Sequence, residues 1–150
     1  MKAVIQKVIN ASVTVDDAVV SSIKKGLCVL VGVGTDDTVE DVNKLCNKLL
    51  KLRLFEDAQE QPWRQTILDA QGEILCVSQF TLHARVNKGA KPDFHRSMKG
   101  PEAVQLYESV LEGLKANLGN DNVKSNVFGA MMNVQLTNNG PVTILYDTKE

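Results

Sequence analysis

Apolar residues in the first third of the chain occur in short runs or alternate with polar ones, a pattern typical of β-strands. The pair Asp16-Asp17 stands between two of these runs, where a hairpin turn would lie. The run 27–31 is apolar throughout, as in a strand buried on both faces, and Gly32 ends it. The pattern therefore predicts strands over 2–8, 12–15, 18–23 and 27–31.

Helical spacing of apolar residues predicts two helices. The first begins at Asp37, because Glu40 follows three residues later as in a capping box. The second begins at Gly100-Pro101, since proline is favoured at the first position of a helix, and it ends at Gly119.

Further apolar runs predict that the chain returns to the sheet after each helix. The most apolar of them, 74–77, is predicted to be a central strand buried on both faces. The others cover 52–55, 123–128, 131–137 and 141–147. Because two helices are inserted among many strands, we expect residues 1–150 to form a single α+β domain. Its sheet should be curled, largely antiparallel and barrel-like, with two main helices.

The composition is that of an ordinary soluble globular protein, with 43% apolar and 23% charged residues. No apolar run is long enough for a membrane span, and the first residues lack the apolar region of a signal peptide. Cys28, Cys46 and Cys76 are odd in number and widely spaced, which argues against disulfides and against a zinc site. We therefore expect a cytoplasmic protein without a membrane partner.

The formal net charge is −1, so no overall field attracts nucleic acid. The segment 85–99 is different, because it carries five cations against one anion, a local balance of +4. Such a basic segment serves either as a phosphate contact or as a solvated loop. Its proline and glycine, without a helical or strand period, make it the most plausible functional loop of the chain.

The central strand ends abruptly in the polar stretch Ser78-Gln79-Phe80-Thr81-Leu82. Polar groups at the end of a rigid strand suit a functional site, although such residues also commonly bond to neighbouring backbone. Thr81 and His83 share strand parity, but residues two apart lie about 6.5 Å apart along a strand. A direct hydrogen bond from a threonine nucleophile to a histidine base is therefore not assured.

The sequence gives no indication of a metal or a cofactor. His83 and His95 have no acidic or cysteine partner at metal-ligand spacing. There is no glycine-rich phosphate-binding loop of the P-loop or dinucleotide type. We therefore expect the protein to use neither a metal nor a cofactor.

A second notable stretch, Asn138-Asn139-Gly140-Pro141-Val142-Thr143, lies near the C-terminus. Its composition predicts a turn joining the last two strands. A Gly-Pro bond can also be cis, which would direct two neighbouring carbonyls the same way and offer a rigid pair of acceptors. On the sequence pattern alone, the turn is favoured.

Together, the stretches 78–82 and 140–143 resemble the two signature motifs of D-aminoacyl-tRNA deacylases, in order and at the family's spacing. The similarity extends along the chain. It includes Met1-Lys2-Ala3-Val4-Ile5-Gln6-Lys7-Val8 with Ala11-Ser12-Val13, Gly26-Leu27-Cys28-Val29-Leu30-Val31-Gly32-Val33, Lys88-Gly89-Ala90-Lys91-Pro92 and the helix around Leu106-Tyr107.

The resemblance implies a homodimer that hydrolyses the ester bond of D-aminoacyl-tRNA, and of mischarged glycyl-tRNA, without a cofactor. Each active site would receive a cis Gly140-Pro141 from the other subunit. Backbone carbonyls there would bind the substrate's α-amino group, and the pocket would exclude an L-side chain by steric conflict.

The resemblance also implies roles for the other motif residues. The ester would be lined by Ser78, Gln79, Phe80 and Thr81, with backbone N–H groups holding the oxyanion. The phosphates of the tRNA acceptor stem would be met by Lys88, Lys91 and Arg96.

Thr81 has two possible roles: it attacks the ester itself, or it positions the substrate while water attacks with help from the 2′-hydroxyl of the terminal adenosine. We prefer the second, because the sequence offers Thr81 no convincing base. Two alternatives to an enzyme also stay open. One is a nucleic-acid-binding module that uses the basic segment without catalysis, and the other is a dimeric scaffold whose motifs only shape the interface.

Overall fold

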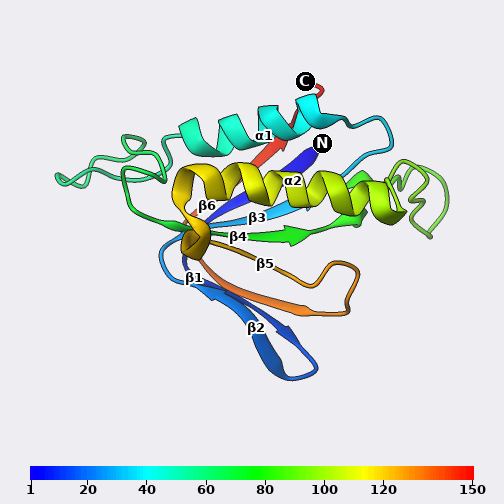
Figure 1. The fold of residues 1–150 in the computed structure, drawn as a ribbon, viewed down its shortest axis with the longest axis horizontal. Coiled ribbons are helices and arrows are strands. Elements are labelled where there is room, and N and C mark those ends of the chain that lie inside the picture. Colours follow the sequence, from blue (N-terminus) through cyan, green and yellow to red (C-terminus); the bar gives the residue numbers. More distant parts are fainter.

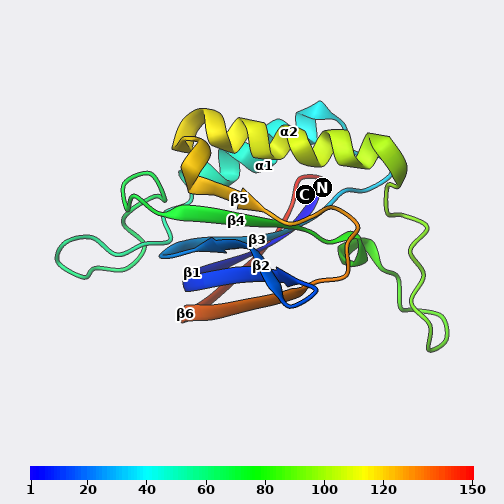
Figure 2. The same cartoon turned by 60° about the horizontal axis from the view of Figure 1, so that its bottom comes forward.

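Two helices pack side by side on one face of a six-stranded mixed sheet (Figures 1 and 2). The computed structural model describes residues 1–150. The helices are α1 (Val39–Lys51) and α2 (Gly100–Leu118), with short 3₁₀ turns η1 (Phe80–His83) and η2 (Asn120–Asn122). The strands are β1 (Lys2–Val15), β2 (Ala18–Ile23), β3 (Gly26–Gly32), β4 (Glu73–Ser78), β5 (Val123–Ser125) and β6 (Asn133–Asp147).

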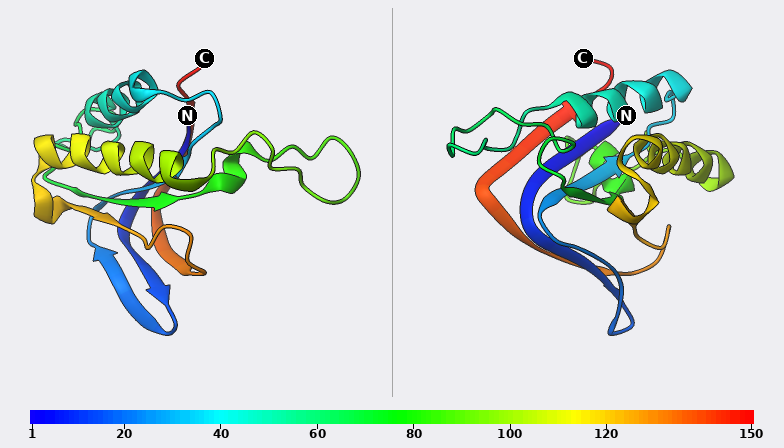
Figure 3. Two further views of the ribbon diagram at one scale, coloured as in Figure 1. Left: turned by 45° about the vertical axis from the view of Figure 1, so that its right-hand side comes forward. Right: turned by 60° about the vertical axis from the view of Figure 1, so that its left-hand side comes forward.

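Strand β1 organises the sheet because it is long enough to pair with three others. It runs antiparallel to β3 over its first half and to β2 over its second, while β6 follows its other edge along almost the whole length. Figure 3 shows β1 and β6 bending together, which curls the sheet towards a barrel. Strands β4 and β5 add in parallel beyond β3. The expected curled α+β fold with two main helices is confirmed.

The two strands that were predicted to be buried on both faces separate two hydrophobic cores. Alternate residues of β3 and β4, such as Val29 and Cys76, face α1 and α2 in a cluster of 20 buried residues. Their neighbours Cys28 and Leu75 face the inside of the curl in a second cluster of 7. All four side chains are fully buried, so the prediction from uninterrupted apolar runs is confirmed.

The start of α1 lies one residue later than the sequence pattern predicted. Thr38 is the N-cap, and its capping-box partner is Asp41, so the predicted pair Asp37 and Glu40 is wrong. Asp37 instead accepts hydrogen bonds from the Met1 amino group (2.6 Å) and from the Gly34 N–H (2.7 Å). Its carboxylate therefore connects the first residue of the chain to the segment between β3 and α1.

The boundaries of α2 agree with the prediction. It starts at Gly100-Pro101 and is followed by Gly119, whose φ of 92° lies in the region that favours glycine. None of the helices combines the length and the apolar character that crossing a membrane requires.

Of the strands predicted to follow the helices, one is absent and one is shorter than expected. Residues 52–55 form no strand: Phe55 makes only an isolated bridge to Gln65, and its ring is buried under the start of a long excursion. The strand predicted over 123–128 ends at Ser125. The excursion at 52–72 and the basic segment leave opposite ends of the domain (Figure 1).

Candidate active site

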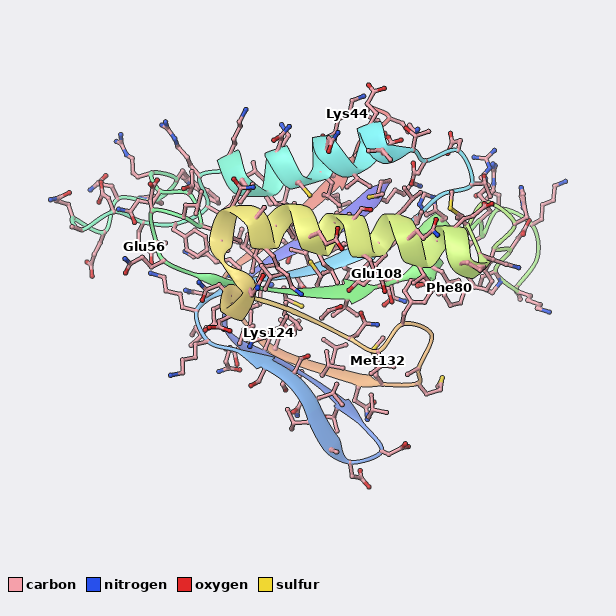
Figure 4. The ribbon with its side chains drawn as sticks, in the orientation of Figure 1. Lys44, Glu56, Phe80, Glu108, Lys124 and Met132 are labelled. Carbon is pink, nitrogen blue, oxygen red and sulfur yellow. The ribbon has the colours of Figure 1, made fainter.

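A cavity of about 510 Å³ opens where β4 ends, beside the start of α2 and the segment that joins β5 to β6. Its walls are mostly apolar. Residues from the polar strand end contribute to it together with others from both neighbouring elements, among them Ser78, Gln79, Phe80, Lys99, Phe128 and Met131. Figure 4 labels Phe80 and Met132 on two of these elements. A largely apolar hollow with a few polar groups at one end is the usual form of a ligand site.

Ser78 is the last residue of β4, and a side chain holds it where the strand ladder stops. Its backbone N–H donates to Asn126 Oδ1 (3.0 Å), and its Oγ accepts from Asn126 Nδ2 (2.9 Å). Asn126 follows directly after β5 and continues the β4–β5 pairing with its amide. The Ser78 hydroxyl therefore has a defined place at the cavity wall.

The residues after Ser78 do not continue the strand. The Gln79 N–H donates to the Val31 carbonyl (2.8 Å), and the chain then turns into η1. Gln79 Nε2 donates to Thr81 Oγ1 (2.6 Å). Thr81 is exposed and lies outside the cavity lining. His83 Nε2 lies 3.0 Å from the carbonyl oxygen of Gly32 and makes no hydrogen bond to Thr81. The hydroxyl of Thr81 is therefore paired with the amide of Gln79 and not with a base.

Two contacts with the basic segment hold Phe80 in place. Its ring is 55% exposed and contacts Phe94 edge to face, with 5.1 Å between ring centroids. Its backbone carbonyl accepts a hydrogen bond from the buried Ser97 (2.8 Å). An exposed aromatic ring that is held in this way offers a flat apolar surface at the cavity mouth.

The basic segment forms a closed hairpin-like loop. The N–H and carbonyl of Arg85 and Asp93 exchange two backbone hydrogen bonds (2.8 and 2.9 Å). Asp93 also accepts from the backbone and the ring of His95, and these bonds lower the pKa of its carboxyl. The three cations predicted to bind tRNA are exposed, and their side chains make no hydrogen bond or ion pair within the chain: Lys88, Lys91 and Arg96.

The Gly140–Pro141 segment is not the turn that the sequence pattern favoured. Strand β6 runs through it without a reversal, so that prediction is wrong. In the pairing of β6 with β1, Asn138 lies opposite Val8, and the next paired residue, Thr143, lies opposite Gln6. The residues between Asn138 and Thr143 therefore form a bulge in β6. The peptide bond between Gly140 and Pro141 is cis, and both residues are exposed.

The side chain of Asn138 closes this bulge. Its Oδ1 accepts from the Val142 N–H (3.0 Å) and its Nδ2 donates to Thr143 Oγ1 (3.0 Å). Gly140 has a φ of 129°, and a Cβ there would lie 2.7 Å from Val142 Cγ2. A glycine is therefore required at this position, because an added methyl would have no room and the backbone angle is one that other residues rarely adopt.

The two motifs do not meet within one chain. Strands β3 and β1 lie between β4 and β6 in the sheet. Across the sheet, Asn138 of β6 pairs with Val8 of β1, which pairs with Gly26 of β3. Gly26 in turn pairs with Glu73, the first residue of β4, so the bulge lies in the same row of the sheet as the start of β4. Ser78 is at the other end of that strand. Neither bulge residue lines the cavity.

Other reactive groups are placed unfavourably for chemistry. No cluster of three or more His, Cys, Asp or Glu side chains is arranged to hold a metal ion. The three cysteines are buried free thiols. Burial raises the pKa of Cys28 and of Cys46 to about 11, and that of Cys76 further, so all three are neutral near pH 7.

Several residues of this site were not found from the sequence. Asn126, Phe128 and Met131 belong to a segment that was expected to be mostly strand. Lys99 was counted in the basic segment but also lines the cavity. No signal in the sequence singled out Asn126, which lies inside the run 123–128 that was predicted to be a strand.

Known proteins resemble this chain over nearly its whole length. Residues 4–147 match the family model described as D-Tyr-tRNA(Tyr) deacylase. The chain is 74% identical over 150 residues to the D-aminoacyl-tRNA deacylase of Schizosaccharomyces pombe, with both chains covered completely.

Two solved structures are similar. One, the c-Myc DNA Unwinding Element Binding Protein, has a TM-score of 0.93 and 46% identity, with 98% of each chain covered. The other, a probable eukaryotic D-amino acid tRNA deacylase, has a TM-score of 0.81 and 97% of each chain covered; at 19% identity it shows the fold alone. The family model spans nearly the whole chain and a relative matches it from end to end. The chain therefore belongs to the D-Tyr-tRNA(Tyr) deacylase family.

Proposed function

We propose that the protein is an ester hydrolase that releases D-amino acids from tRNA. The observation that carries this proposal is that Ser78, Gln79 and Phe80 of the motif line a largely apolar cavity, in a chain that belongs to the deacylase family. Water adds to the ester carbonyl, the bond to the ribose oxygen breaks, and free tRNA and the D-amino acid leave.

The residues of this chain would bind and orient the ester rather than attack it. The Ser78 hydroxyl lies at the cavity wall, and η1 leaves the backbone N–H groups of Phe80 and Thr81 without partners inside the turn. Such donors stabilise the negative charge that develops on the carbonyl oxygen. Gln79 holds the Thr81 hydroxyl, which favours a positioning role for Thr81. The 2′-hydroxyl of the terminal adenosine would assist the attacking water.

We further propose that chirality is selected by Gly140 and Pro141 of the partner subunit in a homodimer. The bulge of β6 is exposed and lies away from the cavity of its own chain, which supports its use in the site of a second copy. Backbone carbonyls of the bulge would bind the α-amino group and leave no space for an L-side chain. Glycine has no side chain to exclude, so glycyl-tRNA would also be hydrolysed.

The tRNA would be held by the basic loop. Lys88, Lys91 and Arg96 are exposed cations without partners in the chain, which is the state expected of groups that await phosphates. The reaction would take place in the cytoplasm, and the three free cysteines are consistent with a reducing compartment.

The first test is deacylation of matched D- and L-tyrosyl-tRNA by the purified protein, with glycyl-tRNA and a chelator-treated sample alongside. We expect release of D-tyrosine and glycine, none of L-tyrosine, and no effect of the chelator. Equal hydrolysis of both tyrosyl esters would remove the chirality filter and leave an esterase. Absence of hydrolysis with tRNA still bound would leave a binding module.

The shared site is tested by mixing two strongly impaired variants, Ser78→Ala and Gly140→Ala. If each site takes Gly140 from the partner subunit, a mixed dimer has one site with both residues intact and one with neither. Activity close to half that of the unmodified protein is then expected per mixed dimer. If both residues came from one chain, every site would carry one defect and mixing would restore nothing.

Binding of DNA is a second candidate function. It is favoured by the similarity to the c-Myc DNA Unwinding Element Binding Protein, at 46% identity over 98% of the chain. The exposed cations of the basic loop would serve this function as well. Direct DNA binding that survives Ser78→Ala but is lost on neutralising Lys88 and Lys91 would support it.

A further inference from the structure

Tyr107 connects helix α2 to the strand end that carries Ser78. The side chain of Tyr107 is buried, and its hydroxyl contacts three oxygen atoms. They are the carbonyl oxygen of Cys76 (3.0 Å), Ser125 Oγ (2.6 Å) and Asn126 Oδ1 (2.9 Å). A phenol has one hydrogen to donate, so this hydroxyl joins the ends of β4 and β5 at a single point.

All four hydrogen-bonding positions of the Asn126 amide are occupied. Its Oδ1 accepts from the Ser78 N–H and is in contact with the Tyr107 hydroxyl. Its Nδ2 donates to Ser78 Oγ (2.9 Å) and to the Val127 carbonyl (3.2 Å). A fully satisfied amide has one orientation, because turning it over would place its nitrogen against the Ser78 N–H.

The orientation of this amide determines what the Ser78 hydroxyl does. A backbone N–H only donates, so the Asn126 atom that faces it is the oxygen, and the nitrogen then faces Ser78 Oγ. Ser78 Oγ must therefore accept from Asn126. Its own hydrogen makes no hydrogen bond within the chain, and the residue lines the cavity.

We propose that Asn126, held in place by Tyr107, is a positioning residue that directs the hydroxyl hydrogen of Ser78 into the cavity. There the hydrogen is available to the carbonyl oxygen of a bound ester. This inference rests on the proposed deacylase activity and assigns to that activity two residues outside the signature motifs.

Tyr107 also supports a second residue of the cavity wall. Its ring packs against that of Phe128, with 5.7 Å between centroids and a tilt of 57°. Phe128 lines the cavity. Burial raises the pKa of the Tyr107 hydroxyl far above its ordinary value, so the phenol stays neutral and keeps its hydrogen at every pH of interest.

The decisive variant is Asn126→Asp, which has nearly the same shape. The introduced carboxylate still accepts from the Ser78 N–H and stays in contact with the Tyr107 hydroxyl, but it has no hydrogen to donate to Ser78 Oγ. The Ser78 hydroxyl then donates to the carboxylate, and its hydrogen is withdrawn from the cavity. We expect kcat for D-tyrosyl-tRNA to fall about 10²- to 10³-fold, the usual cost of removing one hydrogen-bond donor to the developing oxyanion, with KM changed less than about twofold.

The same variant has a signature in its pH profile. When the introduced carboxyl is protonated at acid pH, it again carries a hydrogen that can be donated to Ser78 Oγ. The kcat of Asn126→Asp should therefore recover as the pH falls, relative to the unmodified protein. A purely structural role of Asn126 would not produce this recovery.

A double-mutant cycle completes the test. Adding Ser78→Ala to Asn126→Asp should cause little further loss of kcat, because the hydroxyl is already withdrawn. Tyr107→Phe should give a smaller loss than Asn126→Asp in the same direction. Tyr146→Phe is the matched control, since the Tyr146 hydroxyl makes no hydrogen bond within the chain, and Asn117→Ala removes an amide that only caps a carbonyl on the surface of α2.

Independent losses from Ser78→Ala and Asn126→Asp would overturn the proposal, as would a rise in KM at constant kcat. Unchanged kcat in Asn126→Asp, measured beside an active unmodified protein, would overturn this inference alone. An inactive unmodified protein would overturn the proposed function itself. The melting temperature of each variant shows whether it has folded. If Asn126→Asp does not fold, the kcat of Tyr107→Phe, which loses only one oxygen atom, tests the inference instead.

Discussion

Ser97 Oγ donates a hydrogen bond of 2.8 Å to the backbone carbonyl of Phe80, and this bond joins the end of the basic loop to the turn beside the cavity. Ser97 is 3% exposed, and its backbone N–H bonds to the Phe94 carbonyl (3.0 Å). The hydroxyl is thus a buried connection between the segment proposed to bind tRNA and the segment proposed to bind the ester.

We expect Ser97→Ala to destabilise the protein by about 1 kcal/mol, the usual net value of one hydrogen bond. Because the carbonyl of Phe80 loses its partner, the turn should loosen and kcat should fall with it. Urea unfolding and single-turnover deacylation measure the two effects. Ser109→Ala, which removes an exposed hydroxyl on α2, should change neither. Stability lost with full activity would show that the connection is only structural.

Thr81→Val separates the two roles proposed for Thr81. Its hydroxyl is held by Gln79 Nε2, and His83 is bonded elsewhere, so no base activates it. We expect a loss of about tenfold or less in kcat, with Thr81→Ser close to the unmodified protein. A loss of more than about 10⁴-fold, together with a covalent aminoacyl-enzyme trapped by rapid quenching, would establish a nucleophile instead.

Neutralising the basic loop should weaken tRNA binding without changing the chemical step. For Lys88→Gln and Lys91→Gln we expect a higher KM at equal kcat. Each change should also reduce the slope of log KM against log salt concentration by about 0.7 to 0.9. Lys51→Gln, an exposed cation on α1, is the control. An unchanged salt dependence in the loop variants would mean that this loop is solvated and does not contact phosphates.

Asp41 should make the protein sensitive to acid. Burial alone would raise the pKa of its carboxyl, but hydrogen bonds from Thr148, from the Thr38 backbone and from Lys149 together hold it well below the usual range. A depressed folded-state pKa stabilises the protein above the unfolded value of about 3.9 and loses this effect as the pH falls below it. The free energy of unfolding should therefore decrease below about pH 4.

The variant Asp41→Asn tests this assignment. At pH 7 it should cost about 2 kcal/mol, because it removes a charged acceptor and the capping box of α1. Its unfolding free energy should then depend less on pH between about 4 and 2 than that of the unmodified protein, as followed by urea titrations. Equal pH dependence in the two proteins would assign the acid sensitivity to other carboxylates.

Gly26→Ala should be severely destabilising. A Cβ at Gly26 would lie 1.8 Å from the carbonyl oxygen of Glu73, a backbone atom of the paired strand that cannot move away. We expect a loss on the order of 4 kcal/mol or more. At Gly89 an added Cβ meets nothing within 4 Å, so Gly89→Ala should cost only about 1 kcal/mol for its positive φ. Thermal denaturation of both variants would show whether the close approach at Gly26 has this effect.

The fold class, both helices and the two doubly buried strands followed from the sequence, because each depends on a local periodicity of apolar residues. The run 74–77 showed that a strand would be covered on both faces, and burial of all its side chains agrees. Proline and glycine at the ends of α2 determined its limits, since they act through their own backbone geometry. The resemblance of the two motifs likewise needed only residue order.

Tertiary structure decided what local pattern does not contain. The segment 138–143 has the composition of a turn. However, β6 pairs with β1 on both sides of this segment, so the strand continues and Gly140 and Pro141 form a bulge in it. The order of strands, which keeps this bulge away from Ser78 in one chain, depends on pairing between distant segments. Asn126 bonds to Ser78, and Tyr107 contacts Asn126, only because β4, β5 and α2 meet there. The sequence by itself determined which residues form strands and helices, while long-range pairing and packing determined which of them share a site.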